Sequence, residues 1–434
     1  MNGASVSRAP TVRIHRSLNK ALRLFDADRL RWADEAAALG PVVALRMGPI
    51  NVWIITDADV ARTVLVSDSG SWIRPPATLA PIRVGVGENL FTQTDKNWAK
   101  VQPFVAPAFR RKALEPRLAA IDAVIDDEAQ AIPLDAEIDL EHVMARIALR
   151  LAACVLLGEE LERTRADEIA RHQRAVVGWV GVRLGQLTGF LPFAPGTAGR
   201  EMKQHRAALN AYADEVITRA GSARAGDDVL GALLAARPGG KQLTPDELRG
   251  HVLGLFLAGN ETTAAALSWA VVHGARHPDE WAALRRDPEH RTLAFATESL
   301  RLNPAVWGIP RTPNRAGASL TAAGITTRVR RTQLATIYLR GLNRDPKTWT
   351  DPLHFDPSRH DGNEKDSRRA LIPFGLGPRG CIGQHLALAE IVAALPALAR
   401  RGDVVIDEPV TEDAGFALRI RGGLRGRFTA PRAT

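Results

Sequence analysis

The sequence predicts a single, mostly helical domain with small β-sheets. Helical periodicity dominates from about residue 98 to 302, whereas short strand-like segments lie before and after that stretch. No internal repeat and no shift in composition marks a domain boundary. With 45% hydrophobic and 24% charged residues, the 434-residue chain has the composition of a folded protein. A core of this size can enclose a bulky ligand.

The N-terminal part of the predicted domain contains the clearest strand signals. Residues 42–56 alternate apolar positions on both sides of Gly48-Pro49, which predicts a hairpin, and residues 57–67 have a helical pattern. Residues 70–97 are rich in glycine and proline without a clear period, so we expect a long irregular loop there. Residues 139–157 predict one long helix with an apolar face.

The strongest helix start lies at residue 244. Thr244 is a suitable N-cap, Pro245 suits the first helical position, and Glu247 completes a capping box. The helix predicted over 244–276 is apolar around most of its circumference, which predicts burial through the middle of the molecule. The remaining expected elements are helices over 200–220, 279–286 and 290–302, short strands within 305–340, a helix from about 384 to 400, and short strands to the end.

Charge and cysteine content exclude several classes of protein. The only cysteines are Cys154 and Cys381, so a disulfide framework and a four-cysteine metal site are excluded. No uncharged apolar run reaches about 18 residues, so we expect no membrane span and a cytoplasmic location. Residues 1–20 are expected to form a flexible basic arm ahead of the domain at 21–434. The net charge of +9 is scattered among acidic residues, which disfavours nucleic-acid binding.

One segment carries the chemistry, Phe374-Gly375-Leu376-Gly377-Pro378-Arg379-Gly380-Cys381-Ile382-Gly383. It places a cysteine just before a helix, where backbone N–H groups and the helix dipole favour a thiolate. The glycines let the backbone approach a flat ligand, and Arg379 is placed to pair with a carboxylate of that ligand. The same glycines also fit a dinucleotide-binding pattern, but the alternating strands and helices that such a site needs are missing.

This segment resembles, without a mismatch, the haem-binding signature F-x-x-G-x-R-x-C-x-G of the cytochrome P-450 superfamily. The resemblance covers about residues 40 to 425 and implies a triangular helical prism around haem b. It implies that Cys381 is the axial ligand of the haem iron, through which a thiolate favours cleavage of the O–O bond. Phe374, Gly375 and Arg379 are then expected to contact the cofactor.

The long helix contains a second motif, Ala258-Gly259-Asn260-Glu261-Thr262-Thr263. A threonine hydroxyl within a helix can bond to the carbonyl of the preceding turn, and Gly259 is expected to let a ligand lie against the helix. By itself the motif is weak. It resembles the oxygen-activation motif of the same superfamily, which implies that Thr262 is the distal threonine and Glu261 the neighbouring acid.

Three further residues resemble a structural ionic network of the superfamily. Glu298 and Arg301 share a helix face, and Arg359 lies in the later segment that closes the network. The E-x-x-R pattern is common on surface helices, so only its place in the order of motifs gives it meaning. We expect a buried, forked network that fixes the fold beneath the haem.

Other positions match contacts to the haem propionates. Arg311 stands where the superfamily usually has a propionate-binding arginine. Near residue 100 the sequence departs from the pattern, because Trp98 is followed four residues later by Gln102 instead of an arginine. Trp98 and Gln102 can both donate a hydrogen bond, and Lys100 could supply the missing charge.

The resemblance implies a monooxygenase that activates dioxygen and oxidises an apolar small molecule. Its pocket is expected to be lined by residues 70–97, 172–200 and 253–258. The chain shows no flavin, nicotinamide or iron–sulfur segment, so electrons are expected from separate chains, a ferredoxin and its reductase. The basic runs at 110–112 and 368–369 are expected to steer an acidic carrier, or to be ordinary solvated charge. We expect a monomer.

Three alternatives remain open from the sequence. A peroxygenase of the same fold would use hydrogen peroxide and tends to lack the pair Glu261-Thr262. A haem-binding sensor or carrier would not need that pair. A helical interaction protein would hold no cofactor and would be colourless.

Overall fold

The computed structural model describes residues 9–185, 197–221, 228–314, 317–361 and 369–432. The expected mainly helical architecture with small sheets is confirmed. The α-helices are α1 Leu18–Ala27, α2 Arg29–Ala37, α3 Ala58–Arg62, α4 Pro76–Val86, α5 Asp95–Val105, α6 Arg111–Leu114, α7 Leu118–Ala131, α8 Leu140–Ala152, α9 Arg163–Gly185, α10 Thr197–Ala220, α11 Val229–Ala235, α12 Pro245–Arg276, α13 Pro278–Arg286, α14 Pro288–Leu302, α15 Leu339–Leu342 and α17 Gln384–Arg401.

The strands and short helical turns complete the described elements. The strands are β1 Thr11–His15, β2 Val42–Met47, β3 Ile50–Ile55, β4 Trp72–Ile73, β5 Ile138–Asp139, β6 Gly308–Pro313, β7 Ala318–Ala322, β8 Ile325–Val329, β9 Leu334–Tyr338, β10 Asp403–Val405, β11 Glu412–Ala414, β12 Leu418–Ile420 and β13 Arg425–Thr429. The turns used below are the 3₁₀ turns η3 Ala106–Phe109 and η8 Gly377–Arg379 and the π turn η5 Ala153–Leu157.

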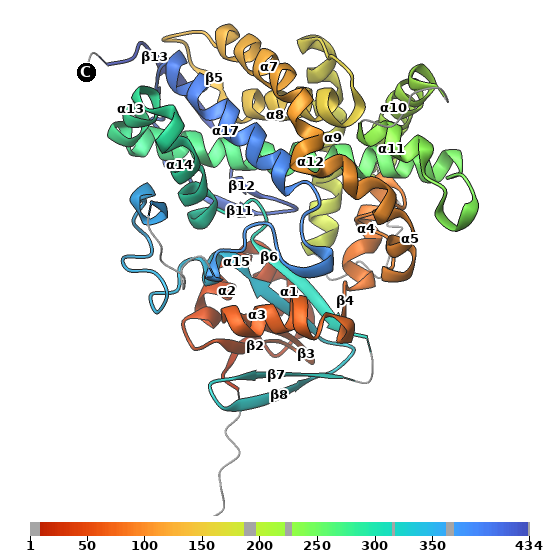
Figure 1. Cartoon of the computed structure of the whole chain (residues 1–434). Coiled ribbons are helices and arrows are strands. Elements are labelled where there is room, and N and C mark those ends of the chain that lie inside the picture. Colours follow the sequence, from red (N-terminus) through yellow and green to blue (C-terminus); the bar gives the residue numbers. More distant parts are fainter. Residues whose placement is uncertain (1–8, 186–196, 222–227, 315–316, 362–368, 433–434) are drawn as a thin grey trace, which may run out of the picture.

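The largest sheet has the strand order β1-β2-β3-β9-β6-β4. The expected hairpin is confirmed, since β2 and β3 pair antiparallel from Val42 opposite Ile55 to Met47 opposite Ile50. Figure 1 shows this sheet together with α1 to α3 in one part of the molecule and most of the long helices in the other. The remaining strands form a three-stranded sheet, β10-β13-β5, and two hairpins, β11-β12 and β7-β8.

The prediction of a flexible N-terminal arm over residues 1–20 is wrong for residues 11–20, which form β1 and the start of α1. Strand β1 pairs in parallel with β2, and α1 begins at Leu18. The physical reason is the alternation in Thr11–His15, which buries Ile14 in the core and packs Val12 partly against it. Residues 1–8 lie outside the described residues.

The irregular loop expected over 70–97 is also corrected, because it contains α4. Pro76 occupies the first turn of that helix, where its missing N–H costs nothing. Gly85 lets α4 approach α9 closely, since a Cβ there would lie 3.0 Å from Val180 and 3.1 Å from Val176. Packing against α9 therefore stabilises a helix whose glycines and prolines conceal it in the sequence.

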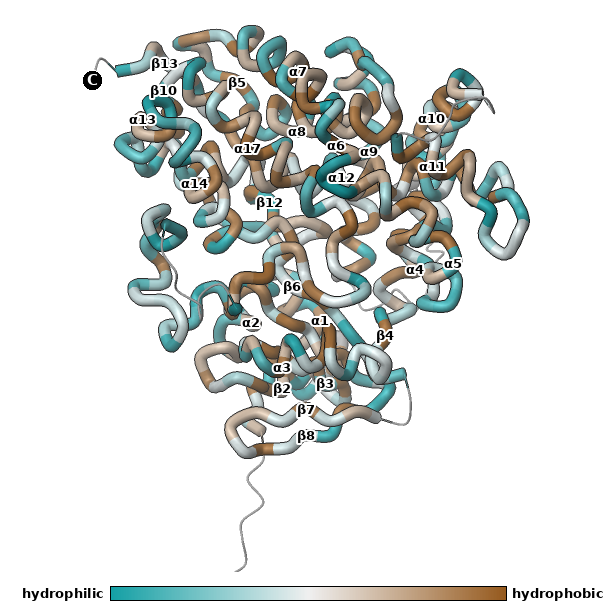
Figure 2. Tube along the Cα trace, in the orientation of Figure 1, coloured by the Kyte–Doolittle hydropathy of each residue, from teal (hydrophilic) through white to brown (hydrophobic). Residues whose placement is uncertain are grey.

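The long helix over 244–276 is confirmed as α12. Thr244 Oγ1 accepts a hydrogen bond from the Glu247 N–H, and the Glu247 carboxylate accepts one from the Thr244 N–H, so the predicted capping box is present. α12 packs against α8, α10, α14 and α17. Figure 2 shows hydrophobic segments gathered in this helical interior and hydrophilic segments toward the outside.

Three further predictions concern the helix over 139–157, membrane-spanning helices and the pocket wall at 172–200. The helix expected over 139–157 is α8 followed by the π turn η5, in which Cys154 is half-buried. Among the described helices, none combines the length and the apolar character needed to cross a bilayer. Part of the expected pocket wall at 172–200 lies outside the described residues, since 186–196 are not described.

Candidate haem and oxygen site

Cys381 lies in a loop held by its own backbone. Its N–H donates to the Phe374 carbonyl at 2.8 Å, and the Gly375 N–H donates to the Ile372 carbonyl at 2.9 Å. α17 begins three residues later, as the sequence predicted. Burial raises the pKa of the Cys381 thiol, while the Gly383 N–H, which donates to the sulfur, lowers it. The loop thus supplies a hydrogen bond to a thiolate but no cationic partner of its own.

The left-handed glycines explain why this loop needs its sequence. Gly375 and Gly377 have φ values of +69° and +72°, a conformation that other residues rarely adopt. A Cβ at Gly377 would also lie 2.0 Å from the Leu65 carbonyl oxygen. The loop can therefore pack closely against the chain that follows α3 only because glycine occupies this position.

The surroundings of Cys381 fit a large cofactor. Its side chain is exposed, yet enough protein surrounds the sulfur for burial to raise its pKa. We interpret the exposed side chain and the raised pKa together to mean that the sulfur borders an open space inside the protein. Cys154 differs, because it is half-buried and packs against the main hydrophobic core. This contrast favours Cys381 as the ligand.

Three arginines gather beside this loop. Arg379 pairs with Asp95, with 2.8 Å between its Nε and the carboxylate, and its guanidinium lies 4.3 Å from the ring centre of Trp98. Burial lowers the pKa of Arg311 to about 10, with Asp95 opposing this and Arg379 adding to it. Burial, followed by the charges of Arg379 and Arg311, lowers the pKa of Arg74 to about 9.

Burial is the main cause of the lowered pKa values of Arg311 and Arg74, and repulsion by the neighbouring arginines adds to it. Within the described part of the chain, Arg311 has no carboxylate within ion-pair distance and donates only to the Pro310 carbonyl, at 2.9 Å. A ligand that carries carboxylates would neutralise this cluster. Haem carries two propionates, so the residues present fit haem at this place.

The structure brings some of the predicted contacts together and leaves others aside. Trp98 stacks under Arg379, whereas Gln102 is half-buried one turn further along α5 and Lys100 is exposed. Sequence reasoning missed Arg74, because it lies at the start of the segment expected to be an irregular loop. The sequence Arg74-Pro75-Pro76 was the available signal, since proline favours the first turn of a helix.

On α12, Thr262 has the predicted geometry. Its Oγ1 donates to the Ala258 carbonyl at 2.7 Å, one turn earlier. Gly259 is half-buried, and the position that a side chain would occupy there faces the end of α8 and η5. A Cβ there would lie 3.4 Å from Leu156 and 3.8 Å from Ala152. Gly259 therefore allows close packing of α12 on α8 and η5, and its contact with a ligand stays a prediction.

Glu261 is not a free acid. It is buried, and Arg419 from β12 forms an ion pair with it, with 2.6 Å between Arg419 Nε and Glu261 Oε1. Because successive helix residues are rotated by about 100°, Glu261 leaves α12 on a different face from Thr262. Sequence reasoning missed Arg419, which is 158 positions further along the chain.

The network of Glu298, Arg301 and Arg359 is present. Arg301 donates two hydrogen bonds of 2.7 Å to the Glu298 carboxylate, and both side chains are fully buried. Arg359 Nε lies 3.4 Å from the same carboxylate. His360, which sequence reasoning missed, approaches it at 3.0 Å. Burial alone would raise the pKa of Glu298, but hydrogen bonds from Arg301 and His360 lower it to about 2.

Comparison with known proteins identifies the family. The family model for cytochrome P450 matches residues 33–418, so the chain belongs to the cytochrome P450 family. Cyclooctatin synthase of Streptomyces melanosporofaciens is 29% identical over 86% of this chain and 84% of its own length. Cyclooctat-9-en-7-ol 5-monooxygenase of the same organism is 27% identical over the same shares.

The fold agrees with this assignment. CYP175A1 from Thermus thermophilus has a TM-score of 0.80 at 21% identity and covers 97% of this chain and 100% of its own. A 6-coordinated cytochrome P450 from another strain of Thermus thermophilus has a TM-score of 0.75 at 22% identity, with coverage of 94% and 99%. Membership in this family implies a haem-thiolate monooxygenase.

Proposed function

We propose that this protein is a haem b monooxygenase in which Cys381 is the axial ligand of the iron. The observation that carries the proposal is the position of Cys381 in the same loop as Arg379, close to Arg311 and Arg74, which form no ion pair among the described residues. When bound there, haem would supply the iron at which dioxygen is activated with two electrons.

The roles of the surrounding residues follow from their chemistry. Arg379, Arg311 and the newly found Arg74 would hold the propionates, with Trp98 stacked under Arg379. Gln102 is the weaker candidate, since it makes no side-chain hydrogen bond among the described residues. Phe374 and Gly375 shape the loop that presents the sulfur.

Thr262 of α12 is proposed to deliver protons during the reaction. Its hydroxyl already donates to the Ala258 carbonyl, so the hydroxyl oxygen is free to accept a hydrogen bond from water. Glu261 is proposed as the acid behind it, held in place by Arg419.

The substrate is proposed to be a largely apolar small molecule. Leu79, Ile82 and Val86 of α4 and Leu253 of α12 are buried apolar side chains in the segments expected to line the pocket. The relatives point in the same direction, since one is named for cyclooctat-9-en-7-ol, an unsaturated alcohol, and another for leukotriene B4.

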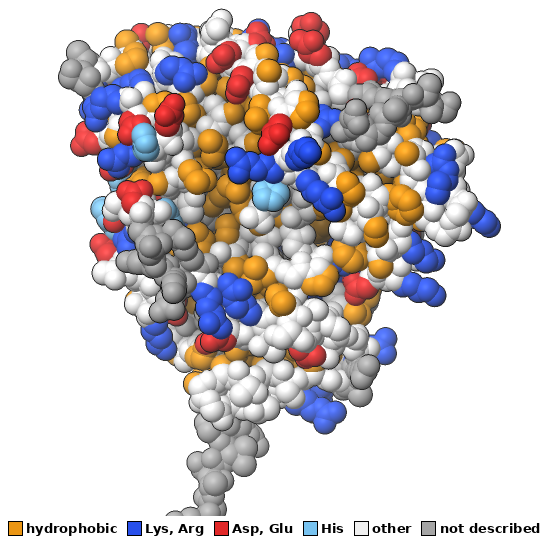
Figure 3. Space-filling model, in the orientation of Figure 1, with side chains coloured by type: hydrophobic (Ala, Val, Ile, Leu, Met, Phe, Trp, Pro, Cys, Tyr) orange, Lys and Arg blue, Asp and Glu red, His pale blue; other side chains and the backbone are white. Residues whose placement is uncertain are grey.

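Separate carrier proteins, a ferredoxin and its reductase, are the proposed source of electrons. Arg110, Arg111 and Lys112 are exposed and follow η3, whose Phe109 lies 3.8 Å from a Cβ built at Gly383 of the cysteine loop. Figure 3 shows basic side chains at the middle of the face on which Figure 1 places the start of α17. Arg369 pairs with Asp59 at 2.5 Å, and Arg368 lies outside the described residues.

Reversal of charge with Arg111→Glu should slow reduction by an acidic ferredoxin at low salt, and an unchanged rate would argue against this surface.

The ligand assignment is tested with Cys381→Ser and the matched control Cys154→Ser. We expect the reduced wild type and the Cys154 variant, exposed to carbon monoxide, to give the far-shifted absorption of thiolate-bound haem, and the Cys381 variant to lose it. A Cys381 variant that kept this absorption would refute the proposal.

The role of Thr262 is tested with Thr262→Ala, and Ser268→Ala is the control because Ser268 makes the same bond to the preceding turn of α12. We expect the Thr262 variant to consume dioxygen while product per dioxygen falls by about tenfold or more, within the range of proton-transfer contributions. Ser268→Ala should leave this ratio unchanged. Unaltered product yield in the Thr262 variant would favour a sensor, and turnover only with hydrogen peroxide would favour a peroxygenase.

A further inference from the structure

A small polar cavity lies where Glu261 leaves α12. It has a volume of about 30 Å³ and is bounded by α8, α9, α12 and β12. Its polar lining includes Glu141, Gln173, Asn260, Glu261 and Arg419. A cavity of this size has room for one or two water molecules.

An unpartnered atom points to water at this place. Asn260 is buried and its Nδ2 donates to Gln173, but its Oδ1 has no partner among the described residues. Buried polar atoms are nearly always hydrogen-bonded, and water is the usual partner when protein groups do not supply one.

The cavity brings a second carboxyl group close to Glu261. Glu141 is half-buried in the first turn of α8, and no described cation lies within ion-pair distance of it. Burial raises the pKa of Glu141, and Arg419 and Arg174 oppose this only in part. The two acids therefore differ, since Glu261 is ion-paired with Arg419 whereas Glu141 has no ion pair among the described residues and a raised pKa.

We propose that this cavity is the place where protons enter from solvent, with Glu141 passing them through water to Glu261. The inference rests on the proposed monooxygenase function. One turnover consumes one substrate molecule, one dioxygen, two electrons from the carrier protein and two protons, and it yields the hydroxylated product and one water molecule. Glu141 gives one proton at a time to the cavity water, Glu261 accepts it as a carboxylate, and solvent then reprotonates Glu141. Arg419 is a positioning residue that keeps Glu261 facing the cavity.

The test compares Glu141→Gln with Glu137→Gln in the haem-loaded protein. Glutamine keeps the shape of the side chain but carries no exchangeable acid proton. Glu137 lies four residues earlier, is exposed and pairs with Arg425 outside the cavity, so it is the matched control. The infrared difference spectrum between wild type and Glu141→Gln should contain the carbonyl band of a protonated carboxyl group, which shifts in heavy water and disappears on titration with base. The difference spectrum of Glu137→Gln should not contain the band that Glu141→Gln removes.

Kinetic readouts separate proton entry from a structural role. At saturating substrate, Glu141→Gln should lower kcat about tenfold with little change in KM, should increase the solvent isotope effect and should lose the fall in rate at alkaline pH. Glu141→Asp should restore part of the rate, which also covers the case in which the glutamine variant folds poorly. If Glu141→Gln kept the kcat, the isotope effect and the pH profile of the wild type, the inference would be overturned. The proposed function would still stand in that case, as long as the variant showed the thiolate absorption and formed product.

Discussion

Glu390 is a fully buried acid whose titration should be visible in the stability of the protein. It lies on α17, and its Oε2 accepts a hydrogen bond of 3.0 Å from Thr263. Burial raises its pKa to about 8 from 4.5, and the hydrogen bond from Thr263 only partly opposes this. Because the folded pKa is raised, the contribution of Glu390 to stability is full below about pH 4.5 and is lost as the pH rises through about 8.

Glu390→Gln should therefore flatten the dependence of stability on pH. At pH 9 we expect the variant to melt about 2 °C or more above the wild type, and at pH 5 we expect nearly equal melting temperatures. Thermal unfolding followed by circular dichroism at both pH values measures this. Glu289→Gln, at an exposed position, serves as the control. A Glu390 variant that tracked the wild type over the whole range would show that this carboxyl group does not hold the proton.

The residues that sequence reasoning identified and those that it missed differ in one physical respect. Cys381, Glu298 and Arg301 belong to short motifs whose spacing fixes their chemistry, and their local geometry is as expected. Arg74 and Arg419 act on groups far away in the chain, so only tertiary packing brings them to the site. Gly259 has the predicted residue type, but the direction of its missing side chain depends on how α12 packs.

At the scale of elements, prediction succeeded where the sequence contains its own start and stop signals. α12 begins with a capping box and an N-terminal proline, so its start could be predicted. α4 contains Pro81 and Gly85 and has weak intrinsic helix propensity, so its existence depends on contacts with α9 that are not readable from its sequence. β1 could be missed because a five-residue strand surrounded by basic residues resembles a loose arm until its partner β2 is placed beside it.

The attachment of α14 to the following segment depends on Arg301. Besides Glu298, its guanidinium donates to the carbonyls of Asn343 and Pro352, both at 2.8 Å, and of His354 at 3.1 Å. Lysine has a single charged nitrogen and cannot reproduce this planar fork. We expect Arg301→Lys to lower the free energy of unfolding by about 3 kcal/mol or more, because it leaves a buried carboxylate incompletely paired.

Urea unfolding at several pH values tests this prediction. Since the pKa of Glu298 is lowered to about 2, its contribution is present above about pH 4.5 and is lost as the pH falls toward 2. The difference between wild type and Arg301→Lys should therefore narrow below pH 4.5. Arg286→Lys on α13, where the side chain is exposed, should change stability by less than about 0.5 kcal/mol. A comparable loss in both variants would contradict a special role for the Arg301 fork.

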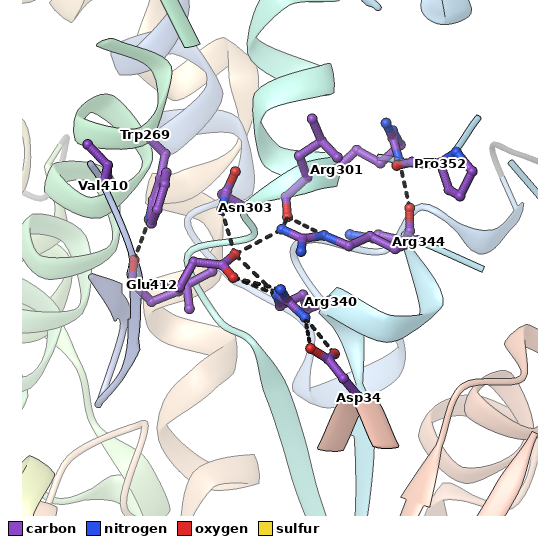
Figure 4. Close-up of polar contacts among 12 residues, drawn as sticks. Asp34, Trp269, Arg301, Asn303, Arg340, Arg344, Pro352, Val410 and Glu412 are labelled. Atoms are coloured by element: carbon purple, nitrogen blue, oxygen red, sulfur yellow. Dashed lines mark hydrogen bonds and ion pairs between the residues drawn. The ribbon is translucent and has the colours of Figure 1, made fainter. Parts of the chain in front are cut away.

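At the scale of the whole molecule, one ionic network joins the sheet region to the helical region. Figure 4 shows Arg340 between Asp34 of α2 and Glu412 of β11, with Arg344 and Asn303 on the same Glu412 carboxylate. Burial raises the pKa of Glu412, but the hydrogen bond from Arg340 and the charges of Arg344 and Arg340 hold it below its usual value. The network therefore ties together segments that are distant along the chain and that no sequence motif connects.

Replacement of the central arginine measures how strongly this network holds the two regions together. Arg340 Nη2 lies 2.7 Å from Glu412, and both side chains are largely buried, whereas Asp34 is half-exposed. Because Arg344 would still pair with Glu412, we expect Arg340→Met to cost about 2 kcal/mol, less than the loss of a fully buried pair. The control is Arg31→Met, which removes an exposed pair with Glu35 and should cost less than about 1 kcal/mol. Equal denaturation midpoints for the two variants would mean that the interlocked hydrophobic cores, and not this network, keep the sheet on the helices.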